Sequence, residues 1–364
     1  DTSASIQGFG NVAQYAIQLY TQLGGTVTSV AWFALSWCAY TLVNLGALES
    51  ERVDTDIEKS LALIQSATEY NQLALVLDPD NDVYRKDLST TFAFLADAWM
   101  ERCDLGKAFE YRQEAVRLNR QLFEETAGDD SLQLEFAYAL SGLAKVQRRM
   151  ALVDSAIVSL TESHEVLREL AARNPDNDKY HWEAALREHW TIDLRSWVEP
   201  PERLLPLAQQ VQQELDQLRA QVGLGELSAR VNHAHARIDL AGMARRAGEV
   251  KTADGRLGDA LARLEQIVRE NPESRRGLNL LARAGFEYWA AHGEPPGGLA
   301  EDIVADYLGS DEPARSCHAA SLAARLHLMR GDKAAASDYT SYLLGKGFYD
   351  PEFIAFCREH ALCE

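Results

Sequence analysis

The sequence lacks an excess of basic residues. Its 364 residues carry 36 Lys and Arg against 55 Asp and Glu, which gives a formal net charge of −19. Nucleic-acid binders need a basic stripe that displaces counterions, so this balance argues against a nucleic-acid partner. It also argues against an anionic membrane surface. An acidic surface aids solubility and would suit a basic protein partner.

The sequence also lacks the short motifs of the common enzyme classes. It contains no GxxxxGK[ST] phosphate loop, no HExxH, no GxSxG and no kinase signature, and VGLGELS at 222–228 is too weak for a phosphate cradle. Charged residues at helical spacing, such as Glu114 and Arg117, are typical of helix surfaces. Acid–base catalysis needs carboxylates in a shielded cleft. The sequence therefore predicts a non-catalytic protein with no cofactor.

Cysteine is scarce, and its five positions form no CxxC pair. An odd count in a long chain is not a disulfide framework. We expect Cys38 and Cys103 to be buried as small hydrophobic side chains. A bridge from Cys357 to Cys363, or from Cys317 to Cys357, is an alternative if the domain lies outside the cytosol.

Histidine pairs do not form a metal-binding pattern. His233 and His235 are two residues apart and would point about 200° from each other on a helix. His181 and His189 could share a helix face, but no third ligand lies near them in the sequence. We therefore predict no metal site and expect structural or surface roles for these histidines.

Turn signals recur along the chain with a period of about 48 residues. LDPDND, NPDND and ENPES place prolines at 79, 175 and 272, and turn-like segments fall halfway between them, at 127 and 223. Each unit contains two segments with apolar residues at three- and four-residue spacing. Successive units match in register: Leu95-Ala96 corresponds to Leu143-Ala144, and Leu122 corresponds to Leu170. The pattern predicts paired helices stacked in an array.

The same residues resemble the tetratricopeptide repeat (TPR). The spacing of Leu95-Ala96, Trp99, Ala108 and Ala115 matches that pattern, as does that of Leu322-Ala323, Ala335 and Tyr339 in the last unit. Two features depart from it: the unit has about 48 residues rather than 34, and Ala96 and Ala144 stand where Gly is usual. The resemblance implies an all-α fold, a right-handed superhelical α-solenoid of helix-turn-helix repeats.

The period also predicts the organisation of the chain. The stretch GEPPGGLAED (293–302) is rich in Pro and Gly and indicates a hinge, whereas Pro200, Pro201 and Pro206 predict a longer turn inside the fourth unit. The expected parts are an N-terminal cap (1–30), repeats at 31–79, 80–127, 128–175, 176–223 and 224–272 with a further helix to residue 292, the hinge, and a C-terminal helical pair and cap (303–364).

Residues 28–48 carry no charge, and neither does any residue between Asp1 and Glu49. Their length meets the criterion of about 20 residues for a membrane span. Polar residues interrupt the stretch, however, and no Lys or Arg flanks it. We predict the first helix of repeat one, covered by residues 2–27, a partner subunit or a neighbouring domain. Because the chain begins with Asp1 rather than Met, we expect a piece of a longer protein.

The tail at 342–363 and the acidic Pro-Asp-Asn turns are similar to repeat regions appended to bacterial signalling proteins, which often follow a kinase or TIR domain. This resemblance implies a bacterial context, in the cytoplasm or the periplasm, and no activity. The densest aromatic cluster provides the candidate partner-binding residues, together with two flanking arginines: Tyr180, Trp182, Arg187, Trp190, Arg195 and Trp197. These residues belong either to the repeat core or to a concave groove that binds a peptide.

We therefore predict a non-catalytic TPR-like scaffold that binds a protein or peptide and forms the sensory part of a larger bacterial signalling protein. Two alternatives stay open. One is a peptide or small-ligand sensor with a pocket near Trp182, Trp190 and Trp197, and the other is a homodimerisation module. We expect no nucleic-acid partner, no metal, and no insertion of this segment into a membrane.

Overall fold

The computed structural model describes Leu35 and residues 38–47, 56–126, 128–222, 227–309 and 316–363. All regular secondary structure in these ranges is helical, which confirms the all-α prediction. The first described helix covers residues 38–47. The others are α3 (Ile57–Leu77), α4 (Asp82–Glu101), α5 (Leu105–Glu125), α6 (Asp130–Arg149), α7 (Val153–Arg173), α8 (Asp178–Arg195), α9 (Pro201–Val222), α10 (Leu227–Arg246), α11 (Val250–Glu270), α12 (Arg275–His292), α13 (Leu299–Gly309), α14 (Cys317–Met329), α15 (Lys333–Gly345) and α16 (Pro351–Glu359).

The 48-residue period appears in the structure as a period of helix caps. Asn81, Asp129, Asn177 and Ser274 each precede the first helix of a unit, and each side chain accepts a hydrogen bond from a backbone N–H in the first turn. Such a cap satisfies an otherwise unpaired donor and stabilises a helix by about 1 kcal/mol. The turn residues therefore set where each helical pair begins.

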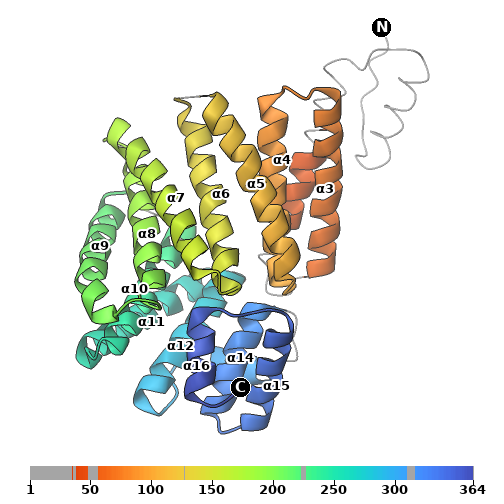
Figure 1. Cartoon of the computed structure of the whole chain (residues 1–364). Helices are drawn as coiled ribbons and strands as arrows, with labels where there is room; N and C mark the ends of the chain where they lie inside the picture. The colour runs from red at the N-terminus through yellow and green to blue at the C-terminus, as the bar shows by residue number, and fades with distance from the viewer. Residues whose placement is uncertain are drawn as a thin grey trace.

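Consecutive helices pack side by side and form a curved array (Figure 1). The second helix of each unit packs on the first helix of the next, as α5 does on α6 and α7 on α8. First helices of successive units also contact each other, from α4 to α6, from α8 to α10, from α10 to α12 and from α12 to α14. These first helices therefore line the inner side of the curve, as in other helical solenoids.

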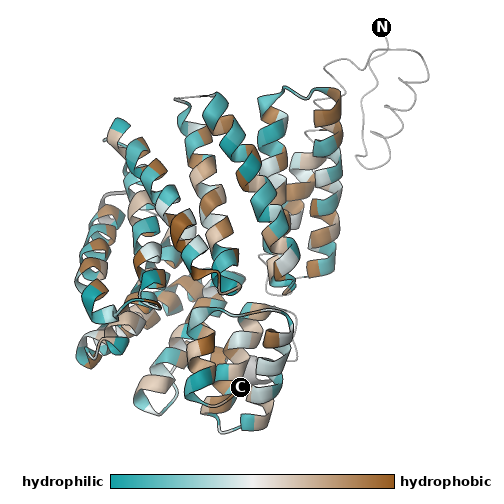
Figure 2. Cartoon of the chain, viewed as in Figure 1, coloured by the Kyte–Doolittle hydropathy of each residue, from teal (hydrophilic) through white to brown (hydrophobic). Residues whose placement is uncertain are grey.

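The core lies between the helices and follows the predicted register. The small residues Ala96, Ala108, Ala144 and Ala156 are buried where helices approach closely. Hydrophobic and hydrophilic residues accordingly alternate along the helices (Figure 2). Burying one large aliphatic side chain contributes about 1.5–3 kcal/mol, so this repeated pattern supplies the main stabilisation of the array.

The uncharged N-terminal stretch is described only in part. Residues 38–47 form a helix on which α3 packs: the Ser60 hydroxyl donates a hydrogen bond of 2.8 Å to the Gly46 carbonyl. A Cβ on Gly46 would clash with the side chain of Ile64, so glycine permits this close approach. Among the described residues, no helix is long and apolar enough to cross a membrane. The cap expected at residues 1–30 lies outside the described residues.

The array curves far enough to bring its C-terminal helices back to its first units. Helices α14 to α16 lie below the lower ends of α4 to α6 in Figure 1. The Tyr349 N–H donates a hydrogen bond of 2.7 Å to the carbonyl of Arg149, and a disulfide joins Cys103 to Cys317, with their Cα atoms 5.0 Å apart. The superhelix is therefore closed by contacts between residues more than 190 positions apart in sequence, as the 214-residue separation of the disulfide illustrates.

This disulfide corrects the cysteine predictions. Cys103 is buried, as expected, but it is bridged rather than a free thiol. The alternative bridges, from Cys357 to Cys363 or from Cys317 to Cys357, are not formed, because Cys317 pairs with Cys103 and the other two cysteines carry free thiols. Cys38 is buried, as expected. The sequence could not indicate the true pair, because only the superhelical return of the chain brings residue 317 to residue 103.

The two Pro-rich segments take different forms. In the fourth unit α8 ends at Arg195 and α9 begins at Pro201, so a five-residue turn separates them, and Pro206 lies within α9. Gly293 ends α12 in the left-handed conformation with a φ of 76°, which glycine adopts without strain. The next helix begins only at Leu299. We retain 293–302 as a proposed hinge.

Candidate functional site

A cluster of ion pairs occupies the inner side of the solenoid where α6, α8, α10, α12 and α14 meet the first turn of α16. We call it the inner ionic cluster. Its members come from six helices, and each of its carboxylates pairs with at least one of its arginines: Arg148, Asp193, Asp239, Arg283, Arg325 and Glu352.

Glu352 is the centre of this cluster. Its carboxylate lies 2.9 Å from a guanidinium nitrogen of Arg283, 2.5 Å from one of Arg325 and 3.5 Å from one of Arg148. The Glu352 side chain is only 15% exposed. Burial would raise its pKa, but the three guanidinium groups outweigh burial and hold the pKa of Glu352 well below its usual range. The carboxylate is therefore ionised and strongly held.

The two aspartates of the cluster differ in their electrostatic environment. Asp239 accepts a hydrogen bond of 2.9 Å from Arg283, and its neighbouring histidines and Arg283 lower its pKa despite burial. Asp193 accepts a bond of 2.9 Å from Arg148. Burial and the nearby charge of Asp239 raise the pKa of Asp193. The negative charge of Asp239 disfavours ionisation of Asp193, and the positive charge of Arg148 partly offsets this repulsion.

Local sequence explains why these charges meet. Arg148 and Arg149 lie in the last turn of α6, where cations interact favourably with the helix dipole. Asp350 caps α16, Pro351 follows it, and Glu352 lies in the first turn, where anions are favoured. Arg148 also donates a hydrogen bond of 3.1 Å to Asp350. The basic end of α6 thus faces the acidic start of α16.

A second group of charges lines the inner side near α4. Asp97 pairs with Arg112 at 2.7 Å and lies 3.8 Å from the Lys145 ammonium. Lys145 keeps 53% of its side chain exposed, yet the surrounding helices remove enough water to lower its pKa. Burial, followed by the charge of Arg149, lowers the pKa of His318 to about 3. The inner side therefore presents fixed charges of both signs in a partly dehydrated space.

The aromatic candidates separate into core and partly exposed residues. Trp182 is 2% exposed and packs in the core between α8, α9 and α10. Trp190 and Trp197 are half-buried, and their indole N–H groups have no hydrogen-bond acceptor in the described part of the chain. Tyr180 is half-buried in the first turn of α8. The helical spacing of the tryptophans thus does not place all three on one accessible face.

The two candidate arginines also lie in different environments. Arg187 is 4% exposed; it pairs with Glu183 at 2.8 Å and stacks 4.8 Å from the ring centre of Trp190. Charge reversal at Arg187 would place two carboxylates together in a buried site and would therefore destabilise the fold. Arg195 is more accessible, with 36% of its side chain exposed, and it pairs with Glu199 at 2.6 Å.

Sequence reasoning missed Arg246. Its guanidinium carbon lies 3.8 Å from the ring centre of Trp197, and it donates a hydrogen bond of 2.6 Å to the Ser196 hydroxyl. Cation–π contacts of this kind contribute about 0.5–2 kcal/mol. Arg246 follows Ser196 by 50 residues, about one repeat, and this separation was the available signal for the contact.

The histidines occupy structural positions. His233 pairs with Asp216 at 2.6 Å, and His189 lies 3.6 Å from Asp239. His181 contacts the carbonyl of Pro175, so His181 and His189 do not act together. Burial lowers the pKa of His235 to about 4. Within the ranges given above, no group of three His, Cys, Asp or Glu side chains is arranged to hold a metal ion.

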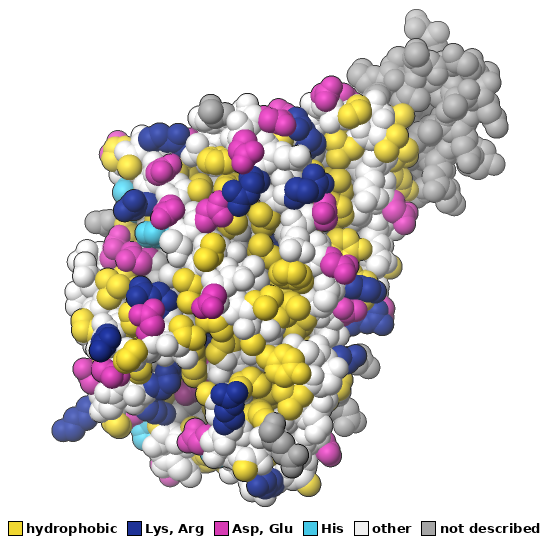
Figure 3. Space-filling view, viewed as in Figure 1, with side chains coloured by type: hydrophobic (Ala, Val, Ile, Leu, Met, Phe, Trp, Pro, Cys, Tyr) yellow, Lys and Arg dark blue, Asp and Glu magenta, His cyan; other side chains and the backbone are white. Residues whose placement is uncertain are grey.

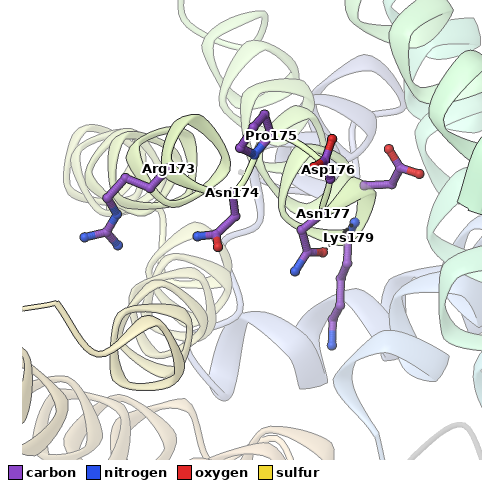
Figure 4. Close-up of a pocket in the computed structure, with 7 residues that line it drawn as sticks. Arg173, Asn174, Pro175, Asp176, Asn177 and Lys179 are labelled. Atoms are coloured by element: carbon purple, nitrogen blue, oxygen red, sulfur yellow. Dashed lines mark hydrogen bonds between the residues drawn. The ribbon is translucent and has the colours of Figure 1, made fainter.

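One surface hollow, of about 680 Å³, lies at the turn between α7 and α8. It is lined by the turn itself, from Arg173 to Lys179, and these two side chains extend in different directions (Figure 4). A ligand pocket normally has polar groups that converge, so this hollow is a feature of the repeat turn. None of Trp182, Trp190 and Trp197 lines it.

The face of the molecule shown in Figure 3 carries acidic and basic side chains interspersed over its upper part. Hydrophobic side chains gather lower on this face, between the lower ends of α5 and α6 and the C-terminal helices.

No protein-family model and no curated protein sequence matches the chain. Solved structures do match it in fold. The Rap conjugation gene regulator of the plasmid pLS20, in complex with a Phr peptide, superimposes with a TM-score of 0.54 at 10% identity, over 88% of this chain and 75% of that one. Aspartyl phosphate phosphatase F from Bacillus subtilis gives 0.52 at 11% identity, over 93% and 76%.

A Rap protein complexed with competence and sporulation factor gives a TM-score of 0.50 at 11% identity, over 96% of this chain and 91% of that one. At identities this low, the superpositions compare folds alone. Together with the helical pairs, the 48-residue period and the inner layer of first helices, these superpositions show that this chain has the fold of a TPR-like α-solenoid.

Proposed function

We propose that the chain is a non-catalytic scaffold that binds a protein or peptide along the inner side of its solenoid. The observation that carries this proposal is the way the inner side already holds a segment of its own chain. At Tyr349–Glu352, a backbone N–H donates to the Arg149 carbonyl, and the Asp350 and Glu352 carboxylates pair with arginines of α6, α12 and α14.

These contacts are the ones that a solenoid uses to bind an extended acidic peptide. Arginine forks hold carboxylates with charge-assisted hydrogen bonds, and backbone groups fix the direction of the segment. The pLS20 regulator, which has the same fold, was solved with a bound Phr peptide, and the Rap protein named above was solved with competence and sporulation factor. The first of these complexes supports a peptide as the partner class.

The charges of the inner ionic cluster favour binding over catalysis. Its carboxylates are paired with arginines, as in Glu352 with Arg283 and Asp193 with Arg148, whereas a general acid or base needs a free carboxyl group with a pKa near the working pH. One neighbour in fold is named a phosphatase, and at 11% identity its name does not extend to this chain. We infer a scaffold in a bacterial signalling protein.

The candidate residues of α8 and the following turn contribute to this scaffold in two ways in our proposal. Tyr180, Trp190, Arg195 and Trp197 are partly exposed and would contact the partner. Trp182 is buried and would act by holding α8 in place, as would Arg187. Homodimerisation is a second candidate, because α3 exposes Leu73, Val76 and Leu77 near the N-terminal end of the array.

Charge reversal tests the partner surface. Arg195→Glu should reduce the amount of partner captured from a bacterial lysate by the full chain after crosslinking, while the melting curve changes little because the Arg195–Glu199 pair is exposed. Arg168→Glu, on the exposed side of α7, is the matched control. Equal capture by both variants would remove Arg195 from the binding surface. Size-exclusion chromatography with light scattering tests the homodimer, and a monomer at micromolar concentration would exclude it.

A further inference from the structure

A hollow of about 410 Å³ opens between α9, α10 and α11. It is lined by Asp216, Arg219, His233, Arg237 and Arg263. Arg237 precedes the cluster member Asp239 by two residues, so the helix turns the two side chains about 200° apart, and the hollow is separate from the inner ionic cluster. Three of its five lining residues are arginines, although the whole chain carries a net charge of −19. The local charge is therefore opposite to that of the protein.

Helical spacing gathers the arginines at this place. Arg230 and Arg237 are seven residues apart on α10, and Arg256 and Arg263 are seven residues apart on α11. Residues at this spacing lie on one face of a helix, two turns apart. Arg219 approaches from the last turn of α9, so three helices direct guanidinium groups toward one region.

The acidic residue in the hollow is already fully paired. Asp216 accepts hydrogen bonds of 2.8 and 2.9 Å from Arg237 and lies 2.6 Å from His233 Nε2. Burial would raise the pKa of Asp216, but the bonds from His233 and Arg237 hold it well below its usual range. Arg237 also reaches Asp259 at 3.3 Å. Asp216 is therefore used to fix Arg237 and His233 in place.

Arg219 and Arg263 have no carboxylate partner among the residues that the structure describes. The contact of Arg219 is with His233 Nδ1, at 3.3 Å. Burial, and after it the nearby charge of Arg263, lowers the pKa of Arg219. Burial also lowers the pKa of His233, so its ring is neutral at pH 7 and accepts from Arg219 while its Nε2–H donates to Asp216. Asp216 is engaged by Arg237 and His233, so two half-buried cations, Arg219 and Arg263, face the hollow without a carboxylate partner of their own among the described residues.

We propose that this hollow binds a small molecule carrying a multivalent oxyanion, of the phosphate-ester or diphosphate class. Guanidinium forks match phosphoryl oxygens in geometry, and a dianion would neutralise both Arg219 and Arg263, whereas a monocarboxylate would neutralise one. The volume lies within the range of about 300–1,000 Å³ typical of small-ligand pockets. This site is independent of the proposed partner surface.

Inorganic pyrophosphate is the probe for the full chain. At constant ionic strength set with sodium chloride, it should raise the melting temperature in a saturable manner and give a binding isotherm by calorimetry. Arg219→Gln and Arg263→Gln should each weaken binding by about tenfold or more, because each removes a charge-assisted fork. Arg269→Gln, on α11 with its side chain 64% exposed and paired with Glu265, is the matched control and should bind normally.

The variant that combines Arg219→Gln with Arg263→Gln should fold, because the two arginines repel each other and their replacement relieves that repulsion. The melting temperature of this double variant without pyrophosphate should equal or exceed that of the wild type. Acetate at the same ionic strength should give no saturable shift. Absence of a pyrophosphate effect, an effect retained in the double variant, or an equal effect of acetate would each overturn the proposal.

Discussion

Replacing Glu352 with Gln should destabilise the fold by about 3 kcal/mol. The change preserves the shape of the side chain and removes only its charge. That charge faces the guanidinium groups of Arg148, Arg283 and Arg325 in a site where the carboxylate is 15% exposed.

The magnitude follows from the partners that stay behind. Removing one member of a buried ion pair costs about 3–5 kcal/mol, because the other charge is left buried and unpaired. Arg148 retains Asp193 and Asp350, and Arg283 retains Asp239. Arg325 has no other ion pair among the described residues, so it bears most of the loss. These remaining pairs place the effect at the lower end of the range.

Urea denaturation followed by circular dichroism measures this loss, with Glu359→Gln as the matched control, since Glu359 is exposed on the same helix. The pKa of Glu352 is lowered in the folded state, so its stabilisation is present above its unfolded pKa of about 4.3 and fades as the pH falls below that value. The difference between wild type and Glu352→Gln should therefore shrink in acid. A loss within about 0.5 kcal/mol of the Glu359→Gln control at pH 7, as for ordinary surface changes, would refute the role assigned to the inner ionic cluster.

Three further outcomes are expected. Without reductant, the chain should be two hydrogens lighter by mass spectrometry than the reduced chain, and Cys103→Ser should lose about 2–5 kcal/mol because the Cys103–Cys317 bridge closes a loop with a separation of 214 residues; five free thiols would contradict the bridge. Phe136→Ala should lose about 3–5 kcal/mol in urea denaturation, because Phe136 is 1% exposed and stacks on Phe123 at 5.0 Å, and an unchanged midpoint would show that the core is loosely packed there. Burial lowers the pKa of His235 to about 4. Between about pH 4 and 6.5 His235 is therefore protonated in the unfolded chain only, and the free energy of unfolding should fall as the pH drops through that window. His235→Asn should flatten the plot of unfolding free energy against pH, and an unaltered slope would contradict this role of His235.

The candidate site was predictable only in part. The seven- and eight-residue spacing of Trp182, Trp190 and Trp197 predicts a single helical stripe, but α8 ends at Arg195, so Trp197 lies in the following turn. Spacing also does not say which part of a helix a neighbour covers. Trp182 is covered by α9 and α10, and Arg187 is enclosed by Glu183 and Trp190. The role of Arg246 was not predictable, because its contact with Trp197 depends on how the next repeat packs.

The sequence by itself determined the local and nearest-neighbour structure of this protein. Cap residues at 81, 129, 177 and 274 mark where helical pairs begin, and the register of Leu95-Ala96 with Leu143-Ala144 predicts how adjacent pairs pack. These features depend on interactions within one helix or between successive units, so their signals repeat at the spacing of the units.

Only the tertiary structure decided how the array closes and where its charges meet. The small rotation between successive units accumulates until Cys317 reaches Cys103 and Glu352 reaches Arg148. In the sequence Glu352 and Arg148 look like any exposed charges on amphipathic helices, and so do Arg219 and Arg263. Their burial and their partners depend on the sum of many inter-repeat angles, which no short segment of the chain encodes.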